Sequence, residues 1–176
     1  MIELRELAHG DAGAVECIYG PESVRFLGRG PMGAREAQAY VAGALAAAER
    51  RPRTLHTLGL TVDDDLLGVV KLHLDRRGAA VSYILRADVW GRGYATEGVL
   101  RIVALGTGKL GLTEFHATHH ADNVASGRVL MRAGFVPTGV RAGLVTYALS
   151  SGRRSVALAG TGPHGSSARV VQNNPS

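Results

Sequence analysis

A chain of 176 residues, of which 45% are hydrophobic, is long enough for one domain with a substantial core and too apolar for a disordered protein. Its single cysteine, Cys17, excludes an internal disulfide and a zinc site built from cysteines. The net charge is +5, but residues 150–176 contribute three arginines and no acid, so the remainder has 17 basic and 15 acidic residues. Such a mildly basic domain argues against a nucleic-acid partner. Without a signal peptide or a membrane-length apolar run, we expect a cytoplasmic protein with no membrane partner.

The first half of the chain shows strand-like alternation, a Gly/Pro-rich stretch and one long alanine-rich run. Asp11 is expected to cap the first helix and Pro52 to end the second. The predicted elements are, in order, a strand at Ile2–Leu7, a short helix to Ile18, a loop over residues 20–34, a helix at Arg35–Arg51, and strands at Thr54–Val62 and Leu66–Leu74 around the acidic turn 63–65.

The second half alternates strands with helices and then ends in a segment rich in Gly and Ser. The predicted elements are a strand at Ala79–Leu85, a glycine turn, an apolar helix at Tyr94–Leu105, a strand at Phe115–His120, a helix at Asn123–Arg132 that Gly134 stops, and strands at Val136–Val140 and Leu144–Leu149. We therefore expect a domain over residues 1–149 and a tail over residues 150–176, either mobile or packed against a neighbour.

The most informative stretch is W-G-R-G-Y-A-T-E at residues 90–97, between a predicted strand and a predicted helix. A glycine turn at a helix start leaves backbone N–H groups free to bind an anion, and the helix dipole adds to the attraction. Gly91 and Gly93 allow close approach of the backbone to a phosphate, and Arg92 adds a positive charge. The turn therefore predicts a pyrophosphate site.

Two common nucleotide motifs are absent from this region. A dinucleotide fingerprint starting at Gly91 would require glycine at position 96, which is Thr96. The later run G-T-G-K-L-G at residues 106–111 has leucine where a Walker loop needs Ser or Thr after the lysine. We interpret Lys109 as a solvated residue near a helix end.

The strand, the turn at residues 90–97, the following helix and strand, and then N-V-A-S at 123–126 and G-F at 134–135 together resemble the GNAT acyltransferase superfamily. Within it, the chain is most similar to the ribosomal-protein N-acetyltransferase (RimJ/RimL-like) branch. The resemblance covers most of residues 2–149. It implies an α+β fold: a mixed, mostly antiparallel sheet of about seven strands, flanked by about four helices, whose fourth and fifth strands splay apart around acetyl-CoA.

The resemblance also implies roles for individual residues, with acetyl-CoA as cosubstrate and no metal. Asn123 would contact the pantetheine arm or cap the following helix, and Ser126 would lie near the sulfur. The backbone that pairs with pantetheine, as an added strand would, belongs to Ile84, Leu85 and Arg86. The pyrophosphate cradle consists of Gly91, Arg92, Gly93, Tyr94, Ala95 and Thr96.

The leaving thiolate must receive a hydrogen bond or a proton. Many members of the superfamily use a tyrosine on the last helix for this step, and the corresponding position here is Leu130. Ser126 is then the best remaining donor.

The general base departs from the family pattern, because Ala80 stands where many relatives have an acid on the fourth strand. The candidates are His119, His120, Tyr83 and Glu97, and water alone is an alternative. Histidine has a suitable ordinary pKa, but neighbours on a strand point to opposite faces, so at most one of the two histidines faces the cleft. We predict Ser126, His119 and Tyr83 as the catalytic residues.

The predicted function is transfer of an acyl group from acetyl-CoA to a primary amine by direct attack in a ternary complex. The acceptor is either a protein N-terminus or a small amine such as an antibiotic or a polyamine. A small cationic acceptor would require acids in the cleft, for which Glu16, Glu22 and Glu36 are candidates. The alternative function is a non-catalytic acyl-CoA-binding or sensing module. A homodimer is compatible with either.

Overall fold

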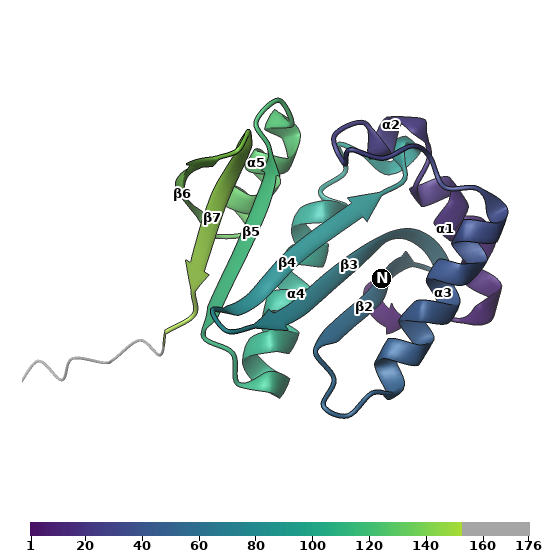
Figure 1. The fold of residues 1–176 in the computed structure, drawn as a ribbon, viewed down its shortest axis with the longest axis horizontal. Coiled ribbons are helices and arrows are strands. Elements are labelled where there is room, and N and C mark those ends of the chain that lie inside the picture. Colours follow the sequence, from purple (N-terminus) through teal and green to yellow (C-terminus); the bar gives the residue numbers. More distant parts are fainter. Residues whose placement is uncertain (153–176) are drawn as a thin grey trace, which may run out of the picture.

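The computed structural model describes residues 1–152, which form one sheet of seven strands with helices on both faces (Figure 1). The strand order is β1-β2-β3-β4-β5-β7-β6, and every neighbouring pair is antiparallel except β4 and β5, which are parallel. The strands are β1 (Ile2–Glu6), β2 (Leu55–Val62), β3 (Asp65–Asp75), β4 (Gly78–Leu85), β5 (Glu114–His120), β6 (Val136–Arg141) and β7 (Leu144–Ser150). This confirms the predicted mixed, mostly antiparallel sheet.

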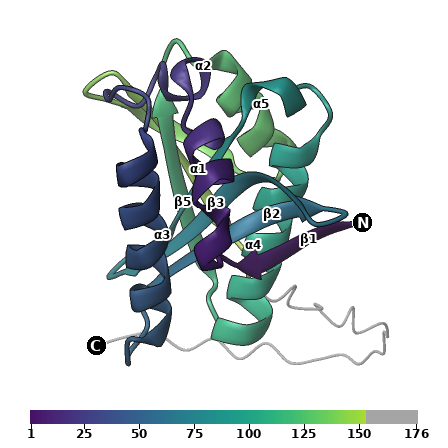
Figure 2. The same cartoon turned by 90° about the vertical axis from the view of Figure 1, so that its right-hand side faces the viewer.

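The helices divide between the two faces of the sheet. Figure 2 shows α3 and α4 on opposite sides. The front face is the one covered by α1, α2 and α3, and the back face is the one covered by α4 and α5. Within residues 1–152 there are five α-helices, one more than predicted: α1 (Ala12–Ile18), α2 (Pro21–Val24), α3 (Ala34–Glu49), α4 (Tyr94–Leu110) and α5 (Val124–Arg132).

A separate hydrophobic core lies on each face, because residues of a strand alternate between the two. On the front face, Val69 and Ile84 pack against apolar positions of the covering helices, such as Val15 and Val41. On the back face, α4 packs Val99 and Ile102 against residues of β2 to β5. The apolar stripe of each helix therefore fixes which face it covers.

Two local predictions in the N-terminal part are wrong. The loop expected over residues 20–34 contains α2, which starts at Pro21, a residue suited to a first helical turn. Asp11 stands at the N-cap of α1 but does not cap it. Its carboxylate instead accepts hydrogen bonds from the Ala8 N–H at 2.7 Å and from Arg5 at 2.7 and 2.8 Å. The hydrogen bond from Arg5 lowers the pKa of Asp11.

The hairpin between β2 and β3 turns at Asp63 and Asp64, as the acidic turn predicts. Both residues have positive φ, 49° and 67°, and Val62 lies opposite Asp65. A two-residue turn of this kind matches the twist of paired strands, and Asp tolerates the left-handed conformation better than most residues.

The splay between β4 and β5 is the feature that positions the site. The two strands pair only at Ala79 with Phe115 and at Ala80 with His116, and then diverge. We call the resulting gap, between residues 81–85 of β4 and residues 117–120 of β5, the wedge. Figure 1 shows it opening towards the ends of α2 and α5. The predicted separation of the fourth and fifth strands is thus confirmed.

No helix in residues 1–152 is both long and apolar enough to cross a membrane. Most of the predicted tail, residues 153–176, lies outside the described residues, and the division of the chain at residue 149 stays a prediction.

Candidate active site

The glycine turn ends directly at the first residue of α4. Gly91 and Gly93 have φ values of 77° and 84°, which only glycine adopts without strain, and Gly93 is the N-cap. No side chain caps this helix, and its first internal bond runs from the Glu97 N–H to the Gly93 carbonyl. The N–H groups before Glu97 are therefore free to bind an anion, and the exposed Arg92 lies among them.

The open edge of β4 is set by hydrogen-bond alternation. The Arg86 N–H donates to the Leu67 carbonyl of β3 at 3.0 Å. Bonded positions alternate along antiparallel strands, so Ile84 also turns its backbone to β3, while Tyr83 and Leu85 turn theirs to the wedge. The structure therefore turns the backbone of Leu85 and Tyr83 to the open edge of β4 and that of Ile84 and Arg86 to β3, while the pairing of residues 84–86 with pantetheine stays a prediction.

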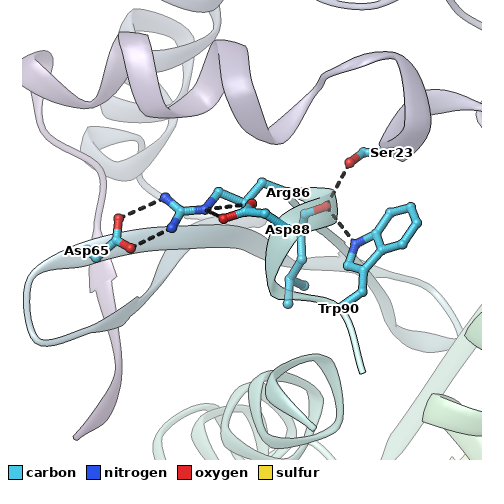
Figure 3. A network of polar contacts seen from close by, with 6 residues as sticks. Ser23, Asp65, Arg86, Asp88 and Trp90 are labelled. Atoms are coloured by element: carbon cyan, nitrogen blue, oxygen red, sulfur yellow. Dashed lines mark hydrogen bonds and ion pairs between the residues drawn. The ribbon is translucent and has the colours of Figure 1, made fainter. Parts of the chain in front are cut away.

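The Leu85 carbonyl already accepts two side-chain hydrogen bonds (Figure 3). The Ser23 hydroxyl of α2 donates from 2.8 Å, and the indole N–H of Trp90 donates from 3.1 Å. Trp90 is 52% exposed, so its ring packs only partly and remains accessible at the start of the cradle. Helix α2 and the glycine turn before α4 thus meet at one carbonyl, a link that the sequence pattern does not reveal.

The Arg86 side chain is committed to two acids. It donates to both carboxylate oxygens of Asp65, at 2.8 and 2.6 Å, and contacts Asp88 at 3.0 Å (Figure 3). The hydrogen bond to Asp65 raises the pKa of Arg86. A guanidinium held in this way is not available to a phosphate, so the exposed Arg92 is the candidate for the positive charge of the cradle.

Tyr83 and Ser126 meet across the wedge. The Tyr83 hydroxyl lies 2.7 Å from the Ser126 hydroxyl and 3.0 Å from the Ser126 carbonyl. Burial raises the pKa of Tyr83 to about 12, so its hydroxyl is protonated at neutral pH and acts as a donor rather than a base. Asn123 caps α5 by accepting from the Ser126 N–H at 3.2 Å, as predicted. Leu130 of α5 is buried in the core, and the tyrosine hydroxyl that meets the start of α5 belongs to Tyr83 of β4.

His119, predicted as a base, does not face the front. Its ring is 9% exposed beneath α5, with Nδ1 2.7 Å from the His120 carbonyl and Nε2 3.1 Å from the Tyr147 hydroxyl. Because a carbonyl only accepts, Nδ1 carries the proton and Nε2 accepts from Tyr147. Gly127 passes close above, where a Cβ atom would lie 2.8 Å from Nε2. Strand alternation predicts that His119 and His120 lie on opposite faces of the sheet. Which of the two is buried depends on the packing of α5 against β5.

His120 is the histidine on the front side. Its ring stacks on Phe26, which follows α2, with ring centroids 5.8 Å apart. Nδ1 accepts from the Asp122 N–H at 3.3 Å, and the Asp122 carboxylate is 3.6 Å away. The last predicted base, Glu97, is bound by Arg101 on the outer surface of α4. In the described part of the chain, no three His, Cys, Asp or Glu side chains group to hold a metal.

A cavity of about 540 Å³ opens next to the end of β4. Ser23, one of its lining residues, donates to Leu85, so the cavity borders the mouth of the wedge rather than the Tyr83–Ser126 pair. Its lining residues are Cys17, Gly20, Pro21, Glu22, Ser23, Arg86, Ala87 and Asp88.

A splayed sheet with an anion cradle at one end and paired hydroxyls inside it defines an acyltransferase of the GNAT class. The family model "Acetyltransferase (GNAT) domain" matches residues 2–136, and the chain belongs to this family. It is also 29% identical over 143 residues to the uncharacterized N-acetyltransferase YoaA of Bacillus subtilis (strain 168), an alignment that covers 78% of this chain and 80% of YoaA.

Solved structures share the fold over 85% of this chain. A probable acetyltransferase matches with a TM-score of 0.74 and 24% identity over 92% of its length. RimJ of Mycobacterium smegmatis, solved with CoA-disulfide, matches at 0.71 and 18% over 82% of its length. The spermidine N-acetyltransferase of Vibrio cholerae, solved with CoA and spermine, matches at 0.71 and 16% over 95%. At these identities the structures establish the fold alone.

Proposed function

We propose that the protein is an acetyl-CoA-dependent N-acetyltransferase in which a primary amine attacks the thioester while both substrates are bound. The observation that carries this proposal is the Tyr83–Ser126 pair, two hydroxyls 2.7 Å apart inside the wedge. Tyr83 comes from β4 and Ser126 from the start of α5, and the pair lies on the back face of the sheet, the face that also carries α4. Membership of the family supports the reaction class.

The cradle holds the pyrophosphate through the backbone N–H groups of residues 92–96 and the charge of Arg92. From there the pantetheine arm runs into the wedge, where its amides pair with the backbone of Tyr83 and Leu85. Asn123 and Ser126 border the arm from the start of α5. The Leu85 carbonyl keeps its bonds from Ser23 and Trp90, so its N–H and the Tyr83 backbone carry this pairing.

In the chemical step the amine nitrogen forms a bond to the thioester carbonyl carbon, the C–S bond breaks, and one amine proton leaves. The sulfur departs as a thiolate and needs a proton. Tyr83, with a pKa of about 12, is a protonated donor suited to that task, and Ser126 orients its hydroxyl through the 2.7 Å contact. In this proposal the hydroxyl pair takes the role that a tyrosine at the position of Leu130 has in many members of the superfamily.

The amine proton leaves on the front side, where His120 is the candidate base. Asp122 lies 3.6 Å from its Nδ1, and the stack on Phe26 holds the ring across the wedge. Because Nδ1 accepts from the Asp122 N–H, the neutral ring carries its proton on Nε2, and Nδ1 is the nitrogen that would take the amine proton in place of that hydrogen bond. His119 serves instead as packing beneath α5, with both nitrogens bonded.

The RimJ/RimL-like branch and the acceptor, either a protein N-terminus or a small amine, belong to this proposal. The fold does not choose between them, because RimJ and a spermidine N-acetyltransferase resemble this chain equally well, at a TM-score of 0.71.

The test is acetyl-CoA turnover by the purified protein. Thiol release would be measured with peptides bearing free N-termini, polyamines and aminoglycosides, and mass spectrometry would identify the acetylated amine. We expect turnover on one class together with its acetylated product. Tight acetyl-CoA binding without turnover on any amine would contradict an enzyme and favour an acyl-CoA-binding module.

A further inference from the structure

We infer that the acceptor amine carries an anionic group, a carboxylate or a phosphate, which binds the Lys71 ammonium on the front face of the sheet. The inference rests on the proposed N-acetyltransferase function and names the substrate class of the same site. It excludes polycations as preferred acceptors.

Lys71 lies next to the reacting position. It is on β3 directly opposite Ser82 of β4, and Ser82 precedes Tyr83, which reaches the back of the wedge. Because strand residues alternate, Ser82 and Lys71 point to the front while Tyr83 points to the back. Neighbouring strands are roughly 5 Å apart. A small molecule whose amine lies in front of Ser82 is therefore long enough to place a second group against the Lys71 ammonium.

The Lys71 ammonium has no acid to neutralise it within residues 1–152. Its Nζ lies 4.8 Å from the centre of the Tyr40 ring of α3, and the side chain is partly buried. Tyr40 is itself neutral, since burial raises its pKa well above the ordinary value, and its hydroxyl meets that of Tyr19 at 3.2 Å. A partly desolvated cation held against an aromatic ring is stabilised by an arriving anion.

Three acids that could attract a polycation either have a partner already or lie away from Ser82. Glu36 is bound by Arg29 at the edge of the front face. Asp75, at the closed end of the wedge, accepts from the Arg77 N–H and lies 3.1 Å from His116. Glu22 lines the cavity at the other end of β4. Lys71 is the charged residue directly opposite Ser82, and its positive charge favours an anionic partner over a cationic one.

The residue type supports this role. Only two of the 20 basic residues are lysines, Lys71 and Lys109, and the other 18 are arginines. A compact ammonium has three rotatable donors that suit either a carboxylate or a phosphate, whereas a guanidinium is a rigid fork. Lys109 lies in the last turn of α4, remote from the wedge, and offers a matched control.

The experiment compares amines that differ only in the anion. The pairs are β-alanine with β-alaninamide for a carboxylate, and O-phosphoethanolamine with ethanolamine for a phosphate, each assayed by thiol release from acetyl-CoA. In parallel, calorimetry measures binding of the same amines to the protein saturated with CoA. The two arms identify which anion is preferred, and spermidine serves as the cationic comparison.

In the native protein we expect the anionic member of at least one pair to show a KM and a dissociation constant about tenfold lower than its neutral partner. Lys71→Met should abolish this difference and leave the neutral partner and acetyl-CoA affinity unchanged. Lys71→Arg should keep part of the difference, and Lys109→Met should keep all of it.

Turnover with no preference for the anion, or a preference that survives Lys71→Met, would overturn the inference and leave the proposed function intact. Lys71-dependent binding of the anionic amine without any acetylated product would uphold the inference and contradict the proposed function instead.

Discussion

The two sides of the wedge are built in different ways. The side proposed for the cofactor comes from short stretches of sequence, residues 83–97 and 123–126, and would bind mainly through backbone groups at two helix starts. The acceptor side comes from side chains far apart in sequence, such as Phe26 stacked on His120 and Tyr40 against Lys71. A ligand part common to a whole family is thus met by local structure, and the variable part is met by long-range packing.

This difference explains how a single fold accommodates many acceptors. Substitutions in α3 or on the front of β3 would change the proposed acceptor side at positions outside the glycine turn of residues 90–97. A direct link between the sides is the Leu85 carbonyl, which accepts from both Ser23 and Trp90.

The largest effect is expected at the Tyr83–Ser126 pair. Tyr83→Phe combined with Ser126→Ala removes both hydroxyls that serve the departing thiolate and should lower kcat about 100-fold. The dissociation constant of acetyl-CoA should stay within about threefold of native, since neither hydroxyl contacts the pyrophosphate. Thiol-release kinetics and calorimetry measure the two quantities.

Each single variant serves as a control and should cost less than the pair, because the remaining hydroxyl can still donate. If acetyl-CoA affinity fell in parallel with kcat, the pair would be a packing contact and the chemistry would lie elsewhere.

A smaller effect, confined to the cofactor side, is expected from Arg92→Glu. Reversing the charge among the free N–H groups of α4 should weaken acetyl-CoA binding roughly tenfold, and less at high salt. S-acetylpantetheine, which lacks the pyrophosphate, should bind the variant and the native protein equally. Arg141→Glu, in the hairpin of β6 and β7, is the matched control. Equal losses for both ligands would remove the cradle assignment.

The packing behind the wedge is tested by Gly127→Ala. The added methyl group would lie 2.8 Å from His119 Nε2 and 3.0 Å from the Tyr147 hydroxyl, so something must shift. The free energy of unfolding in urea should fall by about 1–3 kcal/mol. Gly43→Ala, exposed on α3 with open space around it, should instead stabilise by about 0.5–1 kcal/mol. A stabilised Gly127→Ala variant would show that α5 does not press on His119.

The smallest effect concerns pH and lies away from the wedge. His56 of β2 is buried, its Nε2 has no partner within residues 1–152, and burial lowers its pKa. In the unfolded chain His56 binds a proton near pH 6.5, whereas in the folded chain it does so only at a lower pH. The free energy of unfolding that depends on neutral His56 is therefore fully present above pH 6.5 and declines below it. His56→Leu should flatten the decline between pH 7 and pH 5, measured by urea unfolding. The exposed His73→Leu should leave it unchanged, and equal slopes in all three proteins would contradict the assignment.

The local structure of residues 83–97 and 123–126 was predicted well from the sequence because its determinants are local. Gly91 and Gly93 mark a left-handed turn, Asn123 marks a helix cap, and period-two alternation marks the strands. The turn at residues 63–65 was also predicted correctly from the sequence, since two aspartates suit a tight hairpin.

The errors concern long-range choices. Alternation placed His119 and His120 on opposite faces, but only the position of α5 encloses His119. Asp11 was expected to cap α1, yet Arg5 from the neighbouring strand competes for its carboxylate. Nothing near Ser23 in the sequence indicates its bond to Leu85.

The central claim is that acetyl-CoA lies in the wedge with its pyrophosphate at the start of α4. Amide hydrogen exchange followed by NMR, with and without acetyl-CoA, tests it most directly. We predict increased protection at the amides of residues 92–96, at Leu85 and at the start of α5, with no change along α3. Protection confined to α1–α3, or none at residues 92–96, would contradict the claim.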